Sequence, residues 1–387
     1  MGLKVAIVTF LSDNYGTCLQ AYALQKACEG LGCESVILKH IRKKKSSGMN
    51  RWAVRIRFAV NSALKAGIGN TLRARNVIAE KKHAFSDFRN KNMKITSDSY
   101  TSLLPLVDKY DLFIAGSDMV WSGEYIDYAD FYFLNEVPCE KSGSYAPSFG
   151  KGAGSRENEE RIAGLLNKIR FLSCRERSGV ELIRQLTGRD AALVCDPTLL
   201  FDDTQWKSFF SIGETKSNSI LVNCFGGMPP AFGANAELIR NACGAKTIRY
   251  LNADPADLRK EWKNGNGAYG PLEFIQMVND CAFTIVNGYH GLLFALIFEK
   301  PFFVLHRGEA EHWSEHENRM EELLSYLNLT QRYIYPGDKI EEKDLTMDYG
   351  PIREKIRKLR EESWKYLTCM MEAVENEAQY DGHKSET

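Results

Sequence analysis

The sequence predicts an α/β protein built from two domains that each contain a parallel sheet. Short apolar runs bounded by turn residues alternate with longer segments of helical period, which is typical of parallel strands joined by crossover helices. The chain has 387 residues, too many for one comfortable hydrophobic core, and 44% of them are hydrophobic. Disordered and fibrous proteins are therefore excluded.

In the first half, five short runs are apolar throughout or nearly so, as buried parallel strands are. They lie at residues 5–10, 111–115, 143–146, 171–175 and 192–195. A helix is expected to begin near Thr17, after the first of these runs. We therefore predict an N-terminal Rossmann-like domain over residues 1–202.

A second series of strands and helices follows and predicts a C-terminal Rossmann-like domain over residues 203–340. The expected strands lie at 220–224, 247–251, 283–286 and 302–306, and the helices at 236–242, 272–279 and 292–298. The boundary falls near 202 because Pro197 stops a helix on its N-terminal side and a polar segment begins at Asp202. An amphipathic helix at 350–378 should pack back on the body.

The charge of the chain is balanced, with 50 basic and 50 acidic residues, which argues against nucleic-acid binding through bulk attraction. The exception is the segment 39–94, where sixteen Lys and Arg face only Glu80 and Asp87. We expect a basic helical insertion near 40–95. Its apolar face between Trp52 and Leu64 permits peripheral contact with an anionic membrane surface. A plain solvated helix is the main alternative.

Cysteine and histidine usage points away from metal and redox chemistry. None of the ten cysteines forms a Cys-x-x-Cys pair and the histidines are not clustered, so we expect no metal site and no cofactor. Scattered thiols fit a reducing compartment, and no stretch approaches the roughly 20 apolar residues that cross a bilayer. The expected location is cytoplasmic, with peripheral contact at the inner membrane face as a minority hypothesis.

Two polar loops are expected at the carboxyl edge of the first sheet. Asn14 and Gly16 lie between a buried strand and a helix whose N-terminus leaves backbone N–H groups free for an anion. A plain helix cap is an equal alternative. Gly116, Ser117 and Asp118 follow a later strand. Asp118 could accept a proton from a hydroxyl, or it could only cap a helix.

Further polar residues should reach the same edge. Ser148 follows the strand at 143–146. Arg175 and Glu176 follow the strand at 171–175, where a guanidinium can hold a phosphate or carboxylate through two parallel hydrogen bonds. The alternative is an internal ion pair between the two residues.

In the second half, Asn287 and His290 follow the strand at 283–286. His290 begins an apolar helix, where the helix dipole favours a neutral imidazole or a bound anion. Gly288 and Gly291 permit close backbone approach to a ligand. A purely structural histidine is the alternative.

Taken together and in this order, the runs resemble the polysaccharide pyruvyl transferase family. The resemblance rests on residues 14–16, 20–24, 116–121, 144–150, 173–176, 196–200 and 289–291, and on Arg319 within 318–324. It covers most of residues 3–330. Many family members carry arginine or a serine-phenylalanine pair just before the histidine, where this chain has Gly288 and Tyr289. Arg307 or Arg319 is expected to supply that charge instead.

The resemblance implies two Rossmann-like domains facing a central cleft, similar to the GT-B glycosyltransferases. It also implies an enzyme of cell-surface polysaccharide biosynthesis. Family members transfer pyruvate from phosphoenolpyruvate to two hydroxyls of a sugar as a cyclic ketal and release phosphate. The expected partners are phosphoenolpyruvate and a nucleotide- or lipid-linked sugar acceptor. A nucleotide-sugar-dependent glycosyltransferase and a non-catalytic glycan-precursor-binding relative are the alternatives.

The resemblance and the chemistry together assign roles to the candidate residues. His290 is expected to act in acid–base catalysis with Asp118 or Glu176 as its partner, while Arg175 and Arg319 hold the anionic donor. The other residues expected to bind substrate are Asn14, Gly16, Gly116, Ser117, Ser148 and Asn287.

Overall fold

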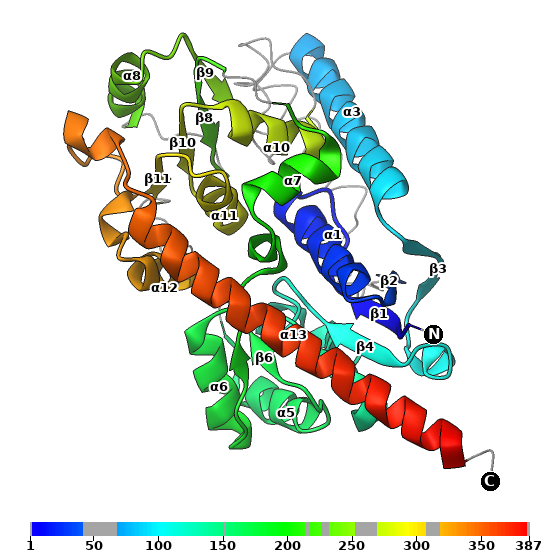
Figure 1. The fold of residues 1–387 in the computed structure, drawn as a ribbon. Helices are drawn as coiled ribbons and strands as arrows, with labels where there is room; N and C mark the ends of the chain where they lie inside the picture. The colour runs from blue at the N-terminus through cyan, green and yellow to red at the C-terminus, as the bar shows by residue number, and fades with distance from the viewer. Residues whose placement is uncertain are drawn as a thin grey trace.

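The computed structural model of the chain describes residues 2–41, 68–150, 152–213, 217–225, 232–251, 269–306 and 318–384. Two five-stranded parallel sheets lie one after the other in the sequence and side by side in space, each flanked by helices (Figure 1). The predicted α/β class with two Rossmann-like halves is confirmed.

The first sheet has the strand order β3-β2-β1-β4-β5, and all its neighbouring strands are parallel. Because β1 lies between β2 and β4, the connections leave β1 and β4 in opposite directions, which is where Rossmann-like sheets bind their ligands. The strands are β1 (Lys4–Val8), β2 (Glu34–His40), β3 (Ile95–Tyr100), β4 (Leu112–Ala115) and β5 (Ser142–Ser144).

A short two-stranded sheet, β6 (Ser173–Cys174) with β7 (Ala192–Leu193), continues beyond β5. The backbone N–H of Ser144 donates to Phe171 O at 2.9 Å, which joins the two sheets. The helices of this half are α1 (Tyr15–Gly30), α3 (Ile68–Asn92), α4 (Ala129–Tyr132), α5 (Arg156–Leu166) and α6 (Arg177–Thr187).

The second sheet has the order β12-β11-β10-β8-β9, again parallel throughout. Its connections leave β8 and β10 in opposite directions, so this sheet also has a ligand-binding position at its carboxyl edge. The strands are β8 (Ser219–Asn223), β9 (Thr247–Tyr250), β10 (Phe283–Val286), β11 (Phe302–Leu305) and β12 (Tyr333–Ile334). The helices are α7 (Asp203–Phe210), α8 (Gly233–Ala242), α10 (Pro271–Asp280), α11 (Tyr289–Ile297) and α12 (Asn318–Leu327).

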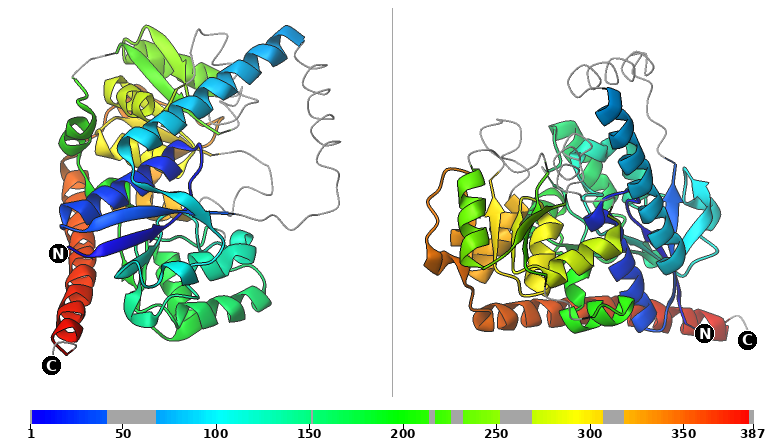
Figure 2. Two further views of the ribbon diagram at one scale, coloured as in Figure 1. Left: turned by 90° about the vertical axis from the view of Figure 1, so that its right-hand side faces the viewer. Right: turned by 90° about the horizontal axis from the view of Figure 1, so that it is seen from above.

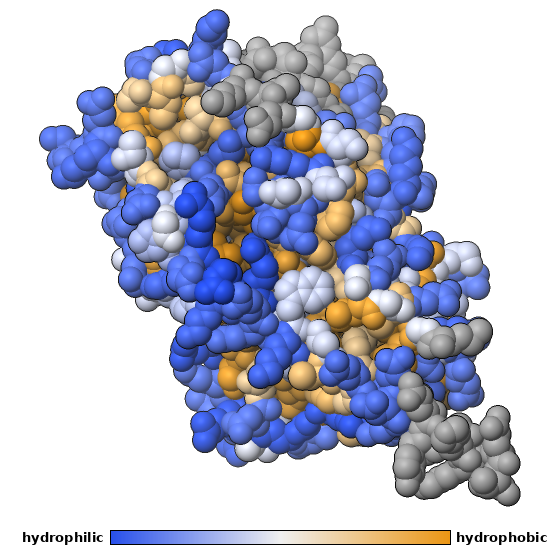
Figure 3. All heavy atoms as spheres, viewed as in Figure 1, coloured by the Kyte–Doolittle hydropathy of each residue, from blue (hydrophilic) through white to orange (hydrophobic). Residues whose placement is uncertain are grey.

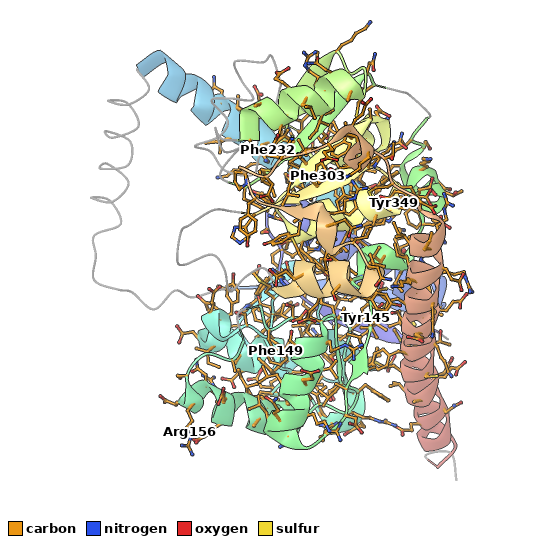
Figure 4. The ribbon with its side chains drawn as sticks, turned by 90° about the vertical axis from the view of Figure 1, so that its left-hand side faces the viewer. Tyr145, Phe149, Arg156, Phe232, Phe303 and Tyr349 are labelled. Carbon is orange, nitrogen blue, oxygen red and sulfur yellow. The ribbon has the colours of Figure 1, made fainter. Side chains whose placement is uncertain are left out.

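One hydrophobic core is shared by the two halves. Its buried members come from β1 and α1 of the first half and from α10 and α11 of the second. Separate cores fill the outer side of each sheet, around Phe149 in the first half and around Phe232 and Phe303 in the second (Figure 4). Continuous packing of α1 against α10 and α11 fixes the two carboxyl edges relative to each other.

The last helix, α13 (Gly350–Lys384), runs along one side of both halves (Figures 1 and 2). Tyr349, just before it, donates to Lys300 O of the second half at 2.6 Å, and Glu377 near its end pairs with Arg170 of the first half at 2.5 Å. Hydrophilic side chains cover much of the outer face over which α13 runs (Figure 3). The predicted helix at 350–378 lies within α13.

The strand positions agree closely with the predicted apolar runs, but three strands were not predicted. β3 carries mostly polar side chains and lies at a sheet edge, and β12 has only two residues. β2 contains the apolar run 36–38, which periodicity could have revealed. The basic segment therefore connects two adjacent strands, β2 and β3. Its apolar face between Trp52 and Leu64 lies outside the described residues, so the membrane contact stays a prediction.

The described helices were also compared with the length and apolarity needed to cross a bilayer. None of them, over the ranges given above, meets both requirements. All ten cysteines belong to these ranges and are free thiols.

Candidate active site

The carboxyl edges of the two five-stranded sheets meet through the N-termini of α1 and α11. Asn14 caps α1 by accepting a hydrogen bond from the backbone N–H of Thr17 at 3.2 Å. Gly288 is the cap residue of α11 and offers no side chain to its first turn. A cavity of about 290 Å³ lies where the two helix ends converge. Its walls are residues Asn14, Tyr15, Gly16, Thr17, Asp118, Met119, Glu124, Asn223, Phe225, Phe274, Gly288, Tyr289, His290, Gly291, Arg319 and Met320.

Gly16 allows the imidazole of His290 to approach the backbone of α1. A Cβ atom on Gly16 would lie 2.0 Å from Nδ1 of His290 and 2.7 Å from its Cβ atom, so no larger residue fits without moving the ring. The side chain of His290 is 15% exposed while its Nε2 atom is fully buried. The exposed surface of the His290 side chain therefore comes from atoms other than Nε2. His290 is also one of the residues that line the cavity.

The carboxylate beside His290 is Asp196, which occupies the place expected for Asp118 or Glu176. Nε2 of His290 lies 3.3 Å from Oδ2 of Asp196, close enough for an ion pair although the geometry is not that of a hydrogen bond. The same Oδ2 accepts from Nη1 of Arg175 at 2.9 Å. The other oxygen, Oδ1, accepts from the backbone N–H and the hydroxyl of Thr198 at 3.0 and 2.8 Å. One buried carboxylate thus connects an imidazole of the second half with a guanidinium of the first.

This surrounding keeps Asp196 ionised. Burial by itself would raise its pKa, but the charges of His290 and Arg175 and the N–H of Thr198 outweigh burial and hold the pKa well below its usual range. An ionised Asp196 in turn stabilises the positive charge of Arg175.

Segment 195–201, which carries Asp196, is held in place by α13. Ser363 accepts from the backbone N–H of Cys195 at 2.8 Å, and Trp364 donates to Leu200 O at 3.1 Å. Arg360 donates to Leu199 O at 2.7 Å. The C-terminal helix therefore supports the site from behind.

Buried polar atoms without a hydrogen bond are concentrated at this site. Some of them still lie near an opposite charge: Nε of Arg175 is 3.6 Å from Oε2 of Glu176, which is the ion pair named above as the alternative to ligand binding. Within the described ranges, seven buried side-chain nitrogen or oxygen atoms make no hydrogen bond. Five of the seven are Nε and Nη2 of Arg175, Oε2 of Glu176, Nε2 of His290 and Nε of Arg319. Buried polar groups in folded proteins are nearly always paired, so such a cluster indicates that a polar ligand or ordered water belongs there.

Tyr289 separates the two arginines. The guanidinium carbon of Arg175 lies 4.7 Å from the centre of the Tyr289 ring, and that of Arg319 lies 5.4 Å from it. A second cavity, of about 480 Å³, lies beside the same ring and is lined by Arg175 and Glu176. Tyr289 and Arg319 line both cavities, so the two spaces are neighbours with a shared wall.

The charges of Arg175, Glu176 and Arg319 beside the two cavities favour binding of a negatively charged ligand. Burial and the like charge of Arg175 lower the pKa of Arg319. Burial also raises the pKa of Glu176, against the opposing effect of both arginines, and so disfavours its charged form. Two buried guanidinium groups with N–H donors that form no hydrogen bond can hold a phosphate or carboxylate.

Asp118 comes from the first half and lines the first cavity together with second-half residues such as His290. Its Oδ2 accepts from the hydroxyl of Thr17 at 2.7 Å, and its Oδ1 accepts from the backbone N–H of Met119 at 2.8 Å. The backbone of Asp118 has a φ of 72°, which aims the residue away from the regular strand path. A carboxylate held in this way can accept a proton from a bound hydroxyl.

The structure brings most of the predicted site residues together. Asn14, Gly16, Asp118 and His290 line the first cavity, Arg175 and Glu176 line the second, and Arg319 lines both. Arg307 lies outside the described residues.

Four predicted residues line neither of these cavities. Ser117 is fully buried and donates to Ala146 O at 2.8 Å, while Gly116 packs against Tyr145 O. Ser148 is fully buried, and Asn287 binds the backbone of another loop. Their predicted contact with substrate stays a prediction.

Two residues of the site were not predicted from the sequence. Asp196 lies in the sequence Asp-Pro-Thr, which looks like a turn and a cap, and it does cap the short 3-10 helix Pro197–Leu200. Tyr289 precedes the histidine in an apolar context, and nothing local indicates that arginines flank its ring. No group of three or more His, Cys, Asp or Glu side chains in the described part of the chain is arranged to hold a metal ion.

Comparison with known proteins identifies relatives of this arrangement. Residues 14–307 match the model of a family described as polysaccharide pyruvyl transferase. No curated protein sequence matches the chain.

Comparison with solved structures gives matches at low sequence identity. Arabidopsis thaliana UGT89C1 is 11% identical with a TM-score of 0.47, and the alignment covers 97% of this chain and 100% of that one. The S. aureus MnaA–UDP structure is 12% identical with a TM-score of 0.45, covering 95% and 91%. The UDP-GlcNAc 2-epimerase from Neisseria meningitidis, bound to UDP-GlcNAc, is 12% identical with a TM-score of 0.40, covering 97% and 99%.

Proposed function

The chain belongs to the polysaccharide pyruvyl transferase family, and we propose that it transfers pyruvate from phosphoenolpyruvate to two hydroxyls of a sugar. The product is a cyclic ketal on a precursor of a cell-surface polysaccharide, and the second product is phosphate. No cofactor takes part in this scheme.

The cluster of buried atoms without a hydrogen bond on Arg175, Glu176, His290 and Arg319 carries the proposal. Phosphoenolpyruvate has a phosphate and a carboxylate, and these need guanidinium groups and free backbone N–H groups. Arg319 reaches both cavities, and the N-termini of α1 and α11 converge on the first. We infer that the donor lies against Arg319 and these helix ends, with Arg175 supporting it from the other side of Tyr289.

The reaction needs a general acid that donates a proton to C3 of phosphoenolpyruvate. A sugar hydroxyl adds to C2 of phosphoenolpyruvate as the C2–C3 double bond opens, and C3 takes a proton to become a methyl group. His290 is the proposed donor, since it lines the cavity and its Nε2 atom lies 3.3 Å from the carboxylate of Asp196, which can hold the ring in place. A positioned general acid of this kind contributes about 10²- to 10⁴-fold in rate.

The second half of the reaction needs a base. The C2–O bond to phosphate breaks, phosphate leaves with the bonding electrons, and the second sugar hydroxyl attacks the resulting oxocarbenium centre and loses its proton. Asp118 is the proposed acceptor of a hydroxyl proton, because Thr17 and Met119 orient its carboxylate in the same cavity as His290. The first hydroxyl also loses its proton as it adds to C2. Of the two hydroxyl protons, one replaces the proton that C3 takes and the other leaves with phosphate, so bonds and protons balance with phosphoenolpyruvate and a diol as the only substrates.

The decisive experiment is a screen of free, nucleotide-linked and lipid-linked sugars with phosphoenolpyruvate. The expected result is release of free phosphate together with an acceptor mass gain of one pyruvyl ketal. Thermal stabilisation by phosphoenolpyruvate alone is also expected, because a ligand that binds only the folded state raises the melting temperature. Stabilisation by nucleotide sugars, with neither phosphate release nor a response to phosphoenolpyruvate, would replace this proposal with glycosyl transfer.

A further inference from the structure

We propose that Glu322 of α12 is a positioning residue that joins the two halves beside the second cavity and sets the separation of Arg175 and Arg319. Its effect on donor binding rests on the proposed function, whereas the contact between the halves rests on geometry alone. Oε2 of Glu322 accepts from the backbone N–H of Arg177 at 2.8 Å and from that of Ser178 at 3.3 Å. A carboxylate of the second half thus caps α6, a helix of the first half.

The first turn of α6 is not capped by the residue that precedes it. The first backbone N–H groups of a helix have no partner inside the helix and are normally capped by that preceding side chain. Here the residue is Glu176, and its side chain makes no cap hydrogen bond. Its Oε1 accepts from the N–H of Phe149 at 2.9 Å instead, and its Oε2 lies 3.6 Å from Nε of Arg175. Because Glu176 turns inward, the positive end of α6 is left to Glu322.

The two segments joined by this contact also carry the arginines of the site. Arg175 directly follows β6 and lies two residues before Arg177. Arg319 lies one turn before Glu322, on the same face of α12. The guanidinium carbons of the two arginines lie 4.7 and 5.4 Å from the centre of the Tyr289 ring. The carboxylate therefore fixes the strand end that supplies one arginine against the helix that supplies the other.

The opposite end of α12 is attached to α13, beside which it lies (Figure 1). The hydroxyl of Tyr326 donates to Lys355 O at 3.2 Å, and Nζ of Lys355 donates to Tyr326 O at 2.5 Å. α12 is thus held by α13 near its C-terminal end and by α6 through Glu322. Loss of the Glu322 carboxylate should free the end of α12 that carries Arg319.

Arg177→Pro removes one donor of this contact and leaves the site residues in place. Proline has no N–H, and it is favoured at the first position of a helix because its fixed φ suits that position. The preceding residue, Glu176, is already extended with φ −118° and ψ 146°, as a residue before proline should be. Arg177→Ala is the matched control, because it removes the same side chain but keeps the N–H. A difference between the two variants therefore reports on the hydrogen bond to Glu322.

Calorimetric titration of the full chain with phosphoenolpyruvate measures the effect without an acceptor. Glu322→Ala and Arg177→Pro should each weaken binding about 10-fold, because a displaced guanidinium loses its contacts to the donor. The double variant should bind little more weakly than either single variant, since both remove the same contact. Arg177→Ala should bind like the unaltered protein.

The conservative variant Glu322→Gln retains an oxygen that can accept from the α6 N–H groups. It should keep the affinity for phosphoenolpyruvate within about 3-fold of that of the unaltered protein, because only the charge is lost. With a competent acceptor, Glu322→Ala should raise KM for phosphoenolpyruvate while kcat changes by less than about 3-fold, since His290 and Asp118 stay in place.

Ser155→Ala separates this role from ordinary helix capping. Ser155 caps α5 by accepting from the N–H of Asn158 at 3.4 Å, and both residues belong to the first half. Its loss should lower the melting temperature, as Glu322→Ala should, and leave the affinity for phosphoenolpyruvate unchanged. Equal weakening of binding in Ser155→Ala would show that loss of any cap has this effect, which overturns the positioning role.

The outcomes separate this inference from the proposed function. Unchanged affinity in both Glu322→Ala and Arg177→Pro overturns the positioning role. If phosphoenolpyruvate does not bind the unaltered protein, the proposed donor is wrong, and amide hydrogen exchange decides whether Glu322 joins the halves. Exchange in peptides spanning 174–182 and 318–327 should be faster in Glu322→Ala than in the unaltered protein and unchanged in Ser155→Ala. Equal exchange in Glu322→Ala and the unaltered protein overturns the inference.

Discussion

The two sheet edges that meet at the site differ in how their functional side chains are supported. On the first, Arg175 and Asp196 are fully buried and pair with each other at 2.9 Å, and Thr198 and Ser117 add contacts from the same half. On the second, His290 begins a helix next to glycines and makes no hydrogen bond through Nε2 to any described residue. The first edge uses its charged groups to hold the fold as well as the ligand. The second presents an imidazole that is partly exposed and forms no hydrogen bond through Nε2 within the described residues, so substitutions should separate stability from activity across the two edges.

The largest expected effect on activity comes from His290→Ala. Phosphate release from phosphoenolpyruvate with a competent acceptor should fall about 10³-fold or more, because the proton donor is lost. The melting temperature should change little, since the ring is partly exposed and has no hydrogen bond through Nε2 in the described chain. Phosphate release and thermal unfolding measure the two effects. His83→Gln, which alters an exposed histidine of α3, is the control. Near-normal turnover in His290→Ala would refute the assignment.

Asp196→Asn should reduce both the stability of the protein and its catalytic activity. Loss of the charge leaves the guanidinium of Arg175 without its closest partner, and breaking a buried ion pair costs roughly 3 kcal/mol of stability. Misplacement of Arg175 and His290 should lower kcat about 10²-fold and raise KM for phosphoenolpyruvate. Urea unfolding and steady-state kinetics provide the measurements.

Asp202→Asn is the matched control for this variant. Asp202 caps α7 through a hydrogen bond to the N–H of Gln205, and asparagine is an equally good cap, so neither property should change. An Asp196→Asn protein as stable as its parent would show that the two edges are not supported differently.

Gly16→Ala tests the closeness of the two edges without removing a functional group. The new methyl group would collide with the His290 ring and should lower kcat about 10-fold, with little change in KM for phosphoenolpyruvate. Stability should change by less than about 1 kcal/mol, because alanine is the better helix former and offsets part of the clash. Gly30→Ala in the same helix meets nothing within 4 Å and should be fully active. Equal activity of the two variants would mean that the ring does not need its observed position.

The smallest expected effect is a change in acid stability. The pKa of Asp196 is lowered in the folded protein, so below its ordinary pKa of about 4 the unfolded chain binds a proton that the native state does not. Stability should therefore decrease as the pH falls below about 4, and Asp196→Asn should flatten that part of the curve. Glu176 has the opposite sign, because its raised pKa makes its contribution weaken as the pH rises. Urea unfolding between pH 3 and pH 7 gives the curves, and parallel curves for the two proteins would contradict the role given to Asp196.

The sequence was most informative where a segment is buried on both sides. The strands around Val5 and Phe283 are mostly apolar, and β10 lies where the apolar run predicted it. It was least informative at sheet edges, where most side chains of β3 are polar and the strand pairs with β2 mainly through its backbone. Backbone pairing leaves no trace in the side chains, so an edge strand of this kind has no local signal.

The candidate site was predicted in part for a similar reason. His290, Asp118 and Arg175 each follow an apolar strand, and residues that follow parallel strands share one sheet edge. The sequence could not show that Ser117 and Ser148 turn inward, because burial depends on what packs over them. Asn287 likewise has its place at the end of β10, but only the tertiary structure shows that it binds the Phe225 backbone.

The order of apolar runs, turns and glycines by itself determined two parallel sheets, the helix that His290 begins, and the membership of a family. Hydrophobic periodicity and the positions of glycines are properties of short sequence segments. They can therefore be recognised without knowing which other parts of the chain lie close in space. Only the tertiary structure decided which carboxylate meets the imidazole and which arginines lie near the ring of Tyr289. Charges and rings act through distances in space, and in this fold those distances are set by the packing of α1 against α11 and of α13 behind segment 195–201.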